Sequence, residues 1–336
     1  MNDQQRATIL DSTSRFPIHQ GVKLSYGTAG FRADGSILSS TVFRVGILAA
    51  LRSLKTKSVI GLMITASHNQ VSDNGVKIAD PSGGMLTQEW EPFADKLANA
   101  GSAEELVRVS LSEVVKSMES DIQFQSSKCY KELLICEFTK EENISFEGKH
   151  HAEVLLARDT RPSGEYLLEA AKQGINSIVG AIATNMGILT TPQLHWMVRC
   201  RNKGHMVSEP AYFDQLSNSF RCLMDLIPKD NTTYVMDEHL IVDGANGVGG
   251  EKLVELKKML SGLVIEVRNS GKKGEGVLNE GVGADFVQKE KVIPHGFDSN
   301  DLGIRLVIYS RVFIFTILFT WLIEKTKGPV KLDKAS

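Results

Sequence analysis

The sequence has few cysteines and no strong excess of either charge. The four cysteines are Cys129, Cys136, Cys200 and Cys222. They form no CxxC pair and lack the spacing of a zinc site, so we expect free thiols in a reducing compartment. The formal net charge of -2 gives no electrostatic basis for binding nucleic acid or an acidic membrane surface. Any anion must therefore be bound by local basic groups and backbone donors.

The sequence also lacks a long apolar segment. Residues 1–16 are polar and charged and contain no signal-peptide core, which predicts a cytoplasmic protein. The most apolar stretch, Leu306 to Ile323, is interrupted by Arg311, whereas a membrane-spanning helix needs roughly 20 apolar residues. For this stretch we favour a β-prone, aromatic segment over a membrane anchor.

The 336 residues, with 42% hydrophobic and 23% charged residues, are typical of a globular protein of two or three domains. Apolar residues at helical spacing alternate with short buried runs. We expect helices at 41–54, 90–98, 103–118, 166–179, 199–231 and 251–259, and strands at 58–64, 154–157, 180–186, 239–242 and 263–267. This alternation predicts an α/β fold with a mostly parallel or mixed sheet, and a second β-loop-α-β unit after residue 190 predicts a second domain.

The segment ITASHNQVSDNGVK, residues 64–77, carries the most informative polar cluster. Ser67 directly follows a buried strand, so we expect it to be exposed at the end of the sheet where α/β sites lie. His68 and Asn69 can hydrogen-bond an oxyanion. Asn74-Gly75 predicts a tight turn that returns Lys77 to the serine, where its amine could neutralise phosphate or move a proton. The alternative is a polar surface loop, because this is not a GxSxG nucleophile elbow.

Two further clusters could bind an anion. In YGTAGFR, residues 26–32, glycines permit close approach of backbone donors and Arg32 provides a planar fork for phosphate. In the loop 157–165, Arg158 and Arg161 flank Asp159, and a structural ion pair is an equally open interpretation. Neither cluster is specific alone.

A glycine-rich loop, DGANGVGG at 243–250, raises the alternative of a dinucleotide site. The glycines follow the order GxxGxGG, and Lys252 stands where the last glycine of GxGxxG belongs. Helix entry through a glycine-rich turn is therefore the favoured interpretation.

Taken together, these segments resemble the phosphoacetylglucosamine mutase family of the α-D-phosphohexomutases. The matching segments are YGTAGFR, TASHN with DNGVK, DPSGGML, ARDTRPSGE, LTTPQLHW and DGANGVGG, in the family's order, with the serine loop before RDTRPS. The similarity runs from about residue 20 to about residue 305, and Gln70 departs from the proline usual after Ser-His-Asn. The resemblance implies three-layer α/β/α domains with mixed sheets.

The resemblance also implies an activity: interconversion of N-acetylglucosamine 6-phosphate and 1-phosphate in UDP-N-acetylglucosamine biosynthesis. In this family the serine of TASHN carries a phosphoryl group, which assigns that role to Ser67. The implied catalytic residues are Ser67, His68, Lys77 and Arg32. The implied substrate- and phosphate-binding residues are Thr28, Gly30, Asn69, Arg158 and Asp159, the last two as supports of the active-site loops.

The family's Mg²⁺ is held by a DGDADR loop together with an oxygen of the phosphoserine, here Ser67, and the sequence contains no such loop. Asp285, Asp298 and Asp301 are not spaced alternately, and loops of the GExSG and RxSGTEP types are also absent. We therefore expect a C-terminally truncated form with residues 1–190 as a first domain, 191–305 as a partial second domain and 306–336 as a divergent tail. Its activity would be impaired; the alternatives are a non-catalytic fragment that binds a sugar phosphate or pairs with a full-length copy, and a membrane-tethered form.

Overall fold

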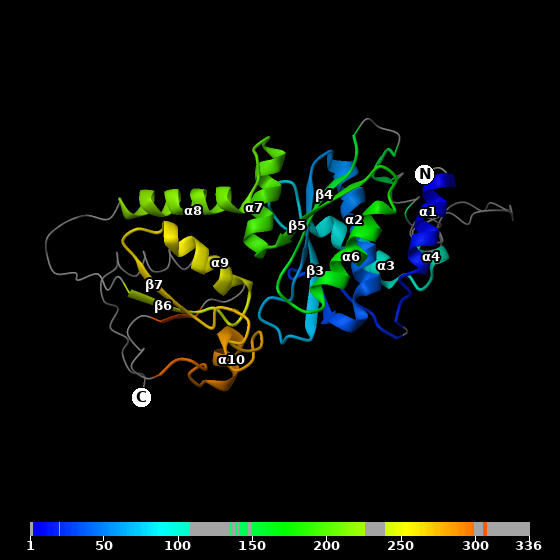
Figure 1. Cartoon of the computed structure of the whole chain (residues 1–336). Helices are drawn as coiled ribbons and strands as arrows, with labels where there is room; N and C mark the ends of the chain where they lie inside the picture. The colour runs from blue at the N-terminus through cyan, green and yellow to red at the C-terminus, as the bar shows by residue number, and fades with distance from the viewer. Residues whose placement is uncertain are drawn as a thin grey trace, which may run out of the picture.

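The computed structural model describes residues 3–19, 21–107, 135, 139, 141–146, 150–225, 239–298 and 305–307. Cys129, Cys136, Asp301, residues 108–118 of one expected helix and nearly all of the expected tail lie outside these residues. Within the described part the strands form two sheets, one of order β1-β3-β2-β4-β5 and one of order β7-β6-β8 (Figure 1).

The first sheet is mixed. Its strands are β1 (Phe31–Asp34), β2 (Ile60–Ile64), β3 (Asp73–Ala79), β4 (Glu153–Arg158) and β5 (Ile182–Ile188). β3 runs antiparallel to both β1 and β2, whereas β2, β4 and β5 are parallel. All five residues of β2 are buried, as expected for a short apolar run that is covered on both faces. The expected strands at 58–64, 154–157 and 180–186 are confirmed.

Helices cover both faces of this sheet, which confirms the three-layer α/β/α fold. α2 (Ser39–Thr56) and α6 (Gly164–Asn176) pack together over one face. α7 (Thr191–Asn202) covers the other face, where Leu194 and Val198 pack with Met63. The other helices of this part of the chain are α1 (Asp3–Ser14), α3 (Glu91–Asn99) and α4 (Ala103–Val107).

The expected turn at Asn74-Gly75 is wrong, because both residues lie inside β3. The chain reverses earlier, within residues 66–73, where Asn69 N donates to Ala66 O and Asp73 N to Gln70 O. β3 pairs along both edges, and Val76 and Ile78 point into the core. Burial and pairing in the middle of a sheet thus override the local turn preference of an Asn-Gly pair.

The second sheet is parallel in the described part. Its strands are β6 (His239–Asp243), β7 (Val264–Arg268) and β8 (Arg305–Val307). α8 (Glu209–Met224) and α9 (Val248–Leu256), with a 3₁₀ turn at Lys257–Met259, share an apolar core with Leu240, Val242 and Ile265. α10 (Gly283–Glu290) follows β7. The expected strands at 239–242 and 263–267 are confirmed.

Two expected boundaries look different in the structure. The described part of the single helical region expected at 199–231 belongs to two helices, because Gly204 adopts a left-handed φ of 77° and Ser208 caps α8, which has Pro210 in its first turn. Residues 226–231 lie outside the described residues. α7 begins at Thr191, where the second domain was expected to start, yet it packs on the first sheet. Leu306, where the tail was expected to start, lies in β8 and pairs with Val242 of β6. The division into 1–190, 191–305 and 306–336 remains a prediction. Below, the first and second domains are simply the elements that pack around the first and second sheets.

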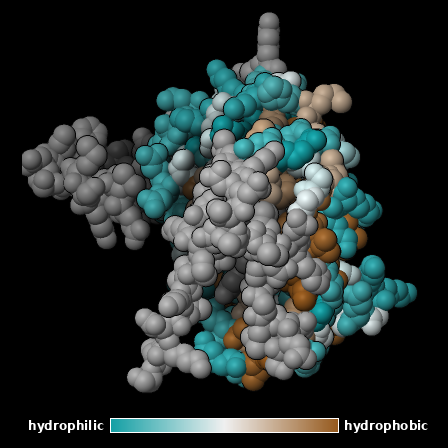
Figure 2. Space-filling model, turned by 90° about the vertical axis from the view of Figure 1, so that its left-hand side faces the viewer, coloured by the Kyte–Doolittle hydropathy of each residue, from teal (hydrophilic) through white to brown (hydrophobic). Residues whose placement is uncertain are grey.

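No helix in the described ranges is long and apolar enough to cross a membrane. Figure 2 shows hydrophobic residues between hydrophilic ones on the side of the molecule at the left of Figure 1. Large exposed apolar side chains of the second unit include Met259, Val264, Val277, Val292 and Ile293.

Candidate functional site

Ser67 lies in a tight reversal at the carboxyl end of β2. Its φ is 58°, in the left-handed region that costs a residue with a side chain about 1–2 kcal/mol. Ser67 N donates to Thr65 Oγ1 (3.0 Å), and Asn69 N donates to Ala66 O (3.2 Å). Such strain persists only where the surroundings impose it, and it clusters at functional sites.

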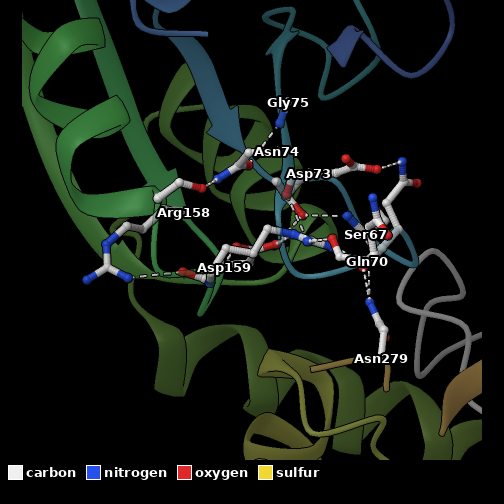
Figure 3. Close-up of polar contacts among 12 residues, drawn as sticks. Ser67, Gln70, Asp73, Asn74, Gly75, Arg158, Asp159 and Asn279 are labelled. Atoms are coloured by element: carbon white, nitrogen blue, oxygen red, sulfur yellow. Dashed lines mark hydrogen bonds and ion pairs between the residues drawn. The ribbon is translucent and has the colours of Figure 1, made fainter. Parts of the chain in front are cut away.

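Arg161 organises the backbone of this reversal. Its side chain is buried, and Nη2 donates to Ser67 O and Asn69 O, both at 2.9 Å. Nη1 donates to Asp73 O (2.9 Å) and to Gln70 O. One guanidinium therefore holds four carbonyls of the loop, and the dashed lines of Figure 3 converge beside Ser67 and Gln70.

Asp159 holds Arg161 in turn. Its Oδ2 accepts hydrogen bonds from Arg161 Nε (3.2 Å) and Thr65 Oγ1 (2.6 Å), and its Oδ1 accepts one from Arg161 N (3.0 Å). Burial lowers the pKa of Arg161, and the nearby carboxylate of Asp159 opposes that shift. Of the two interpretations left open by the sequence, the geometry therefore supports a structural ion pair that fixes the loop.

Asn279, from the domain of the second sheet, also holds the serine loop, and this contact was not predicted from the sequence. Asn279 Nδ2 donates to Ser67 O (3.0 Å) and Asn69 O (2.8 Å), and Figure 3 shows Asn279 directed toward Ser67. Nothing in the sequence singles out this asparagine beyond its glycine-rich neighbourhood.

Ser67 itself is only 5% exposed, so the expectation of an exposed serine is wrong. The loop is in the expected place at the end of β2. However, Arg161 lies against its backbone and Asn279 reaches it from the second domain, which together leave little of the residue open to solvent.

The two expected basic residues lie on neighbouring strands, on one face of the first sheet. Arg32 is paired with Gly75, and Lys77 with Met63, and residues that are directly opposite or two apart share a face. Arg32 Nη1 donates to Asn69 Oδ1 (3.0 Å), which brings it to the serine loop. Asn69 also donates to Asp73 Oδ2 (2.9 Å). The structure thus gathers Arg32 and Asn69 with Ser67, and it places Lys77 on the same face.

His195 of α7 contacts this face. Its Nδ1 is 2.9 Å from Gly83 O, so Nδ1 carries the hydrogen, and Nε2 is buried without a partner. Burial lowers the pKa of His195, the hydrogen bond to Gly83 O opposes this shift, and the charge of Lys77 adds to it. Sequence reasoning did not select this histidine.

The remaining expected residues are less closely connected. His68 is half-buried beside Ser67, and Thr28 is exposed. Arg158 donates to Glu165 Oε2 (2.6 Å) and to the carbonyl of Asp159 (3.0 Å) rather than to the loop carbonyls that Arg161 holds. Phosphate binding by Thr28 and Arg158 remains a prediction.

Gly30 has a packing role. Its φ is 75°, and a Cβ there would lie 2.2 Å from Val76 O, so only glycine fits against β3. Its amide donates to Gly27 O (2.7 Å). A role of Gly30 in binding phosphate also remains a prediction.

The described residues do not fit a magnesium site. In the described part of the chain, no three His, Cys, Asp or Glu side chains gather where a metal ion could bind. Three described carboxylates on or around the loop already accept hydrogen bonds. Asp73 accepts one from Asn69 Nδ2, Asp159 is bonded as above, and Asp243 at the end of β6 accepts from Ala245 N, Gly283 N and Asn269 Nδ2. Among the described residues, Ser67 therefore has no carboxylate neighbours arranged as the oxygen ligands that Mg²⁺ prefers.

Known proteins resemble this chain in sequence over most of its length. A family described as "Phosphoglucomutase/phosphomannomutase, alpha/beta/alpha domain I" matches residues 46–103. The chain is 57% identical over 307 residues to a phosphoacetylglucosamine mutase of Arabidopsis thaliana, covering 91% of this chain and 50% of the relative. It is 38% identical over 282 residues to the Homo sapiens protein of that name, with 83% and 46% covered. The chain thus spans about half the length of the curated relatives it matches.

Two solved structures are similar as well. A serine-to-alanine variant of the Aspergillus fumigatus N-acetylphosphoglucosamine mutase with glucose 1,6-bisphosphate aligns with a TM-score of 0.72 and 34% identity, covering 89% of this chain and 50% of that one. The same enzyme with GlcNAc-6P and magnesium aligns with a TM-score of 0.69 and 35% identity, with the same coverage.

Proposed function

This chain belongs to the phosphoacetylglucosamine mutase family, and on that premise we propose that Ser67 accepts and donates a phosphoryl group in the interconversion of N-acetylglucosamine 6-phosphate and 1-phosphate. The observation that carries the proposal is the strained Ser67 at the end of β2, held by hydrogen bonds to its carbonyl from both domains. Phosphoryl transfer depends mainly on positioning and charge stabilisation, and a fixed serine loop provides the first.

The proposed step begins with a bisphosphorylated sugar. A bond forms between Ser67 Oγ and phosphorus while the bond between phosphorus and the sugar oxygen breaks. The serine proton passes to the departing sugar oxygen, and we assign Lys77 as its carrier. Phosphorylated Ser67 then transfers this group to the free 1-hydroxyl of N-acetylglucosamine 6-phosphate, whose proton passes to Ser67 Oγ. The bisphosphate so formed reorients and returns its 6-phosphoryl group to Ser67, which leaves the 1-phosphate.

Charge is the second requirement. A phosphoserine brings close to two negative charges at neutral pH. Arg32, which reaches the loop through Asn69, and Lys77 on the same sheet face are the cations that we assign to offset them. His68 adjoins the serine and is assigned to the phosphate's surroundings.

We also propose that these 336 residues alone turn over sugar phosphate slowly. The solved relative that holds GlcNAc-6P also holds magnesium, and the described carboxylates here are not arranged to bind that ion. A bound divalent cation contributes several kcal/mol to transition-state stabilisation, to order of magnitude. The alternative is a non-catalytic cytoplasmic fragment that binds sugar phosphate or pairs with a full-length copy.

Two assays test the proposal. Incubation with glucose 1,6-bisphosphate labelled in its phosphates should transfer label to the protein, and the Ser67→Ala variant should take up none. A coupled assay with N-acetylglucosamine 6-phosphate, magnesium and the bisphosphate then measures turnover. Turnover within about tenfold of a full-length homologue, roughly 1.4 kcal/mol in barrier, would reject the slow-turnover proposal. Absence of label would reject the role of Ser67.

A further inference from the structure

Two carbonyl groups of the serine loop are each held twice. Ser67 O accepts one hydrogen bond from Arg161 Nη2 (2.9 Å) and one from Asn279 Nδ2 (3.0 Å). Asn69 O accepts from the same two nitrogens at 2.9 and 2.8 Å. A carbonyl oxygen has two lone pairs, so both acceptors are fully used. The two donors belong to different domains.

Each donor is anchored to its own sheet. Arg161 is paired with Asp159, which directly follows β4 and whose amide donates to Ile64 O at the end of β2. Asn279 N donates to Ala245 O (3.0 Å), just beyond the end of β6. Gly283 N donates to Asp243 Oδ2 (2.7 Å), which ties the other end of this turn to β6 as well. The serine loop is therefore connected to the central strand of each sheet.

From this geometry we propose that Asn279 is a positioning residue that couples the orientation of the Ser67 loop to the docking of the second domain. The inference rests on the proposed function, because it gives Asn279 its role through Ser67. Docked, the amide turns the carbonyls of residues 67 and 69 inward and maintains the left-handed φ of the serine. Undocked, the carbonyls of Ser67 and Asn69 keep only the bonds from Arg161.

Asparagine suits this position for two reasons. Asn279 has a φ of 58°, a conformation that asparagine adopts more readily than most residues with a side chain. Its amide presents two N–H bonds in one plane, and both are needed to reach two carbonyls. A carboxylate of the same shape would turn oxygen lone pairs toward those carbonyls.

The test compares three variants of the full chain. Asn279→Gly keeps the left-handed backbone accessible and removes only the amide. Asn279→Asp keeps the shape and reverses the polarity. Asn269→Gly is the matched control, since Asn269 has a φ of 48° and its amide bonds to Asp243 Oδ1 and His295 O within the second domain.

Hydrogen exchange of the amides in residues 67–73 is the first readout. Two lost hydrogen bonds should speed this exchange about tenfold or more in Asn279→Gly and further in Asn279→Asp, and leave it unchanged in Asn269→Gly. Label transfer from glucose 1,6-bisphosphate should slow in the same order. A purely space-filling role predicts that Asp behaves like Asn, and that result would overturn the inference.

The two proposals can fail separately. If the unaltered chain takes up no label, the role of Ser67 fails while hydrogen exchange still decides the coupling. If label transfer occurs and loop exchange in Asn279→Gly equals that of the unaltered chain, the coupling fails and the role of Ser67 stands.

Discussion

The two domains support the same loop in unequal ways. The first sheet has apolar cores on both faces, and its support is a buried guanidinium that contacts four loop carbonyls. The described second sheet has a core on one face, whereas Val264 on the other is 58% exposed and Ile241 is partly exposed. Its support is a single amide. We therefore expect the loop's stability to depend on the first domain and its orientation on the second.

The largest expected effect is the loss of the first-domain support. Arg161→Ala leaves Asp159 buried without its cation and removes one donor from each of four loop carbonyls, so the free energy of unfolding should fall by about 3–5 kcal/mol. The control is Arg158→Ala, because the partner of Arg158, Glu165, is 75% exposed and such pairs contribute about 1 kcal/mol or less. Urea unfolding followed by circular dichroism measures both variants. Equal losses would mean that Arg161 has no special role.

A smaller effect is expected where the first glycine-rich segment meets β3. Gly30→Ala forces a Cβ to within 2.2 Å of Val76 O at a left-handed φ, which should cost about 1–3 kcal/mol. Gly27→Ala is the control, since nothing lies within 4 Å of a Cβ there and a change within about 0.5 kcal/mol is expected. Thermal unfolding of the two variants side by side measures the difference. If Gly30→Ala and Gly27→Ala unfolded at the same temperature, β3 would have to shift away from the added Cβ at little cost in free energy.

The smallest effect concerns pH. Burial lowers the pKa of His195 in the folded protein, so the unfolded chain binds its proton more readily. Stability should therefore be complete above the ordinary histidine pKa of about 6.5 and fall as the pH drops from there toward the lowered folded pKa. His195→Gln should flatten this part of the stability profile. The same change at the exposed His205 should leave the slope intact, and an equal flattening there would contradict the assignment.

Whether a feature of the fold or the site could be predicted depends on how far apart in the sequence the interacting residues lie. The apolar run at 58–64 correctly predicted that Ser67 follows a buried strand, because neighbouring residues alone determine this pattern. The turn expected at Asn74-Gly75 was wrong because pairing on both edges of β3 is a tertiary effect. The bond from Asn279 to Ser67 spans 212 residues, and no periodicity or spacing relates the two. The ion pair of Asp159 and Arg161 is an intermediate case. The sequence placed both residues in one loop, but it did not show which way their side chains point.

The position of the phosphoryl group after incubation with glucose 1,6-bisphosphate decides most directly whether Ser67 carries phosphate. Peptide mapping by mass spectrometry distinguishes Ser67 from its neighbour His68 and from Ser72 in the same loop. We expect a phosphate on Ser67, at lower occupancy in Arg161→Ala. A phosphate on another residue, or none in the unaltered chain, would contradict this expectation.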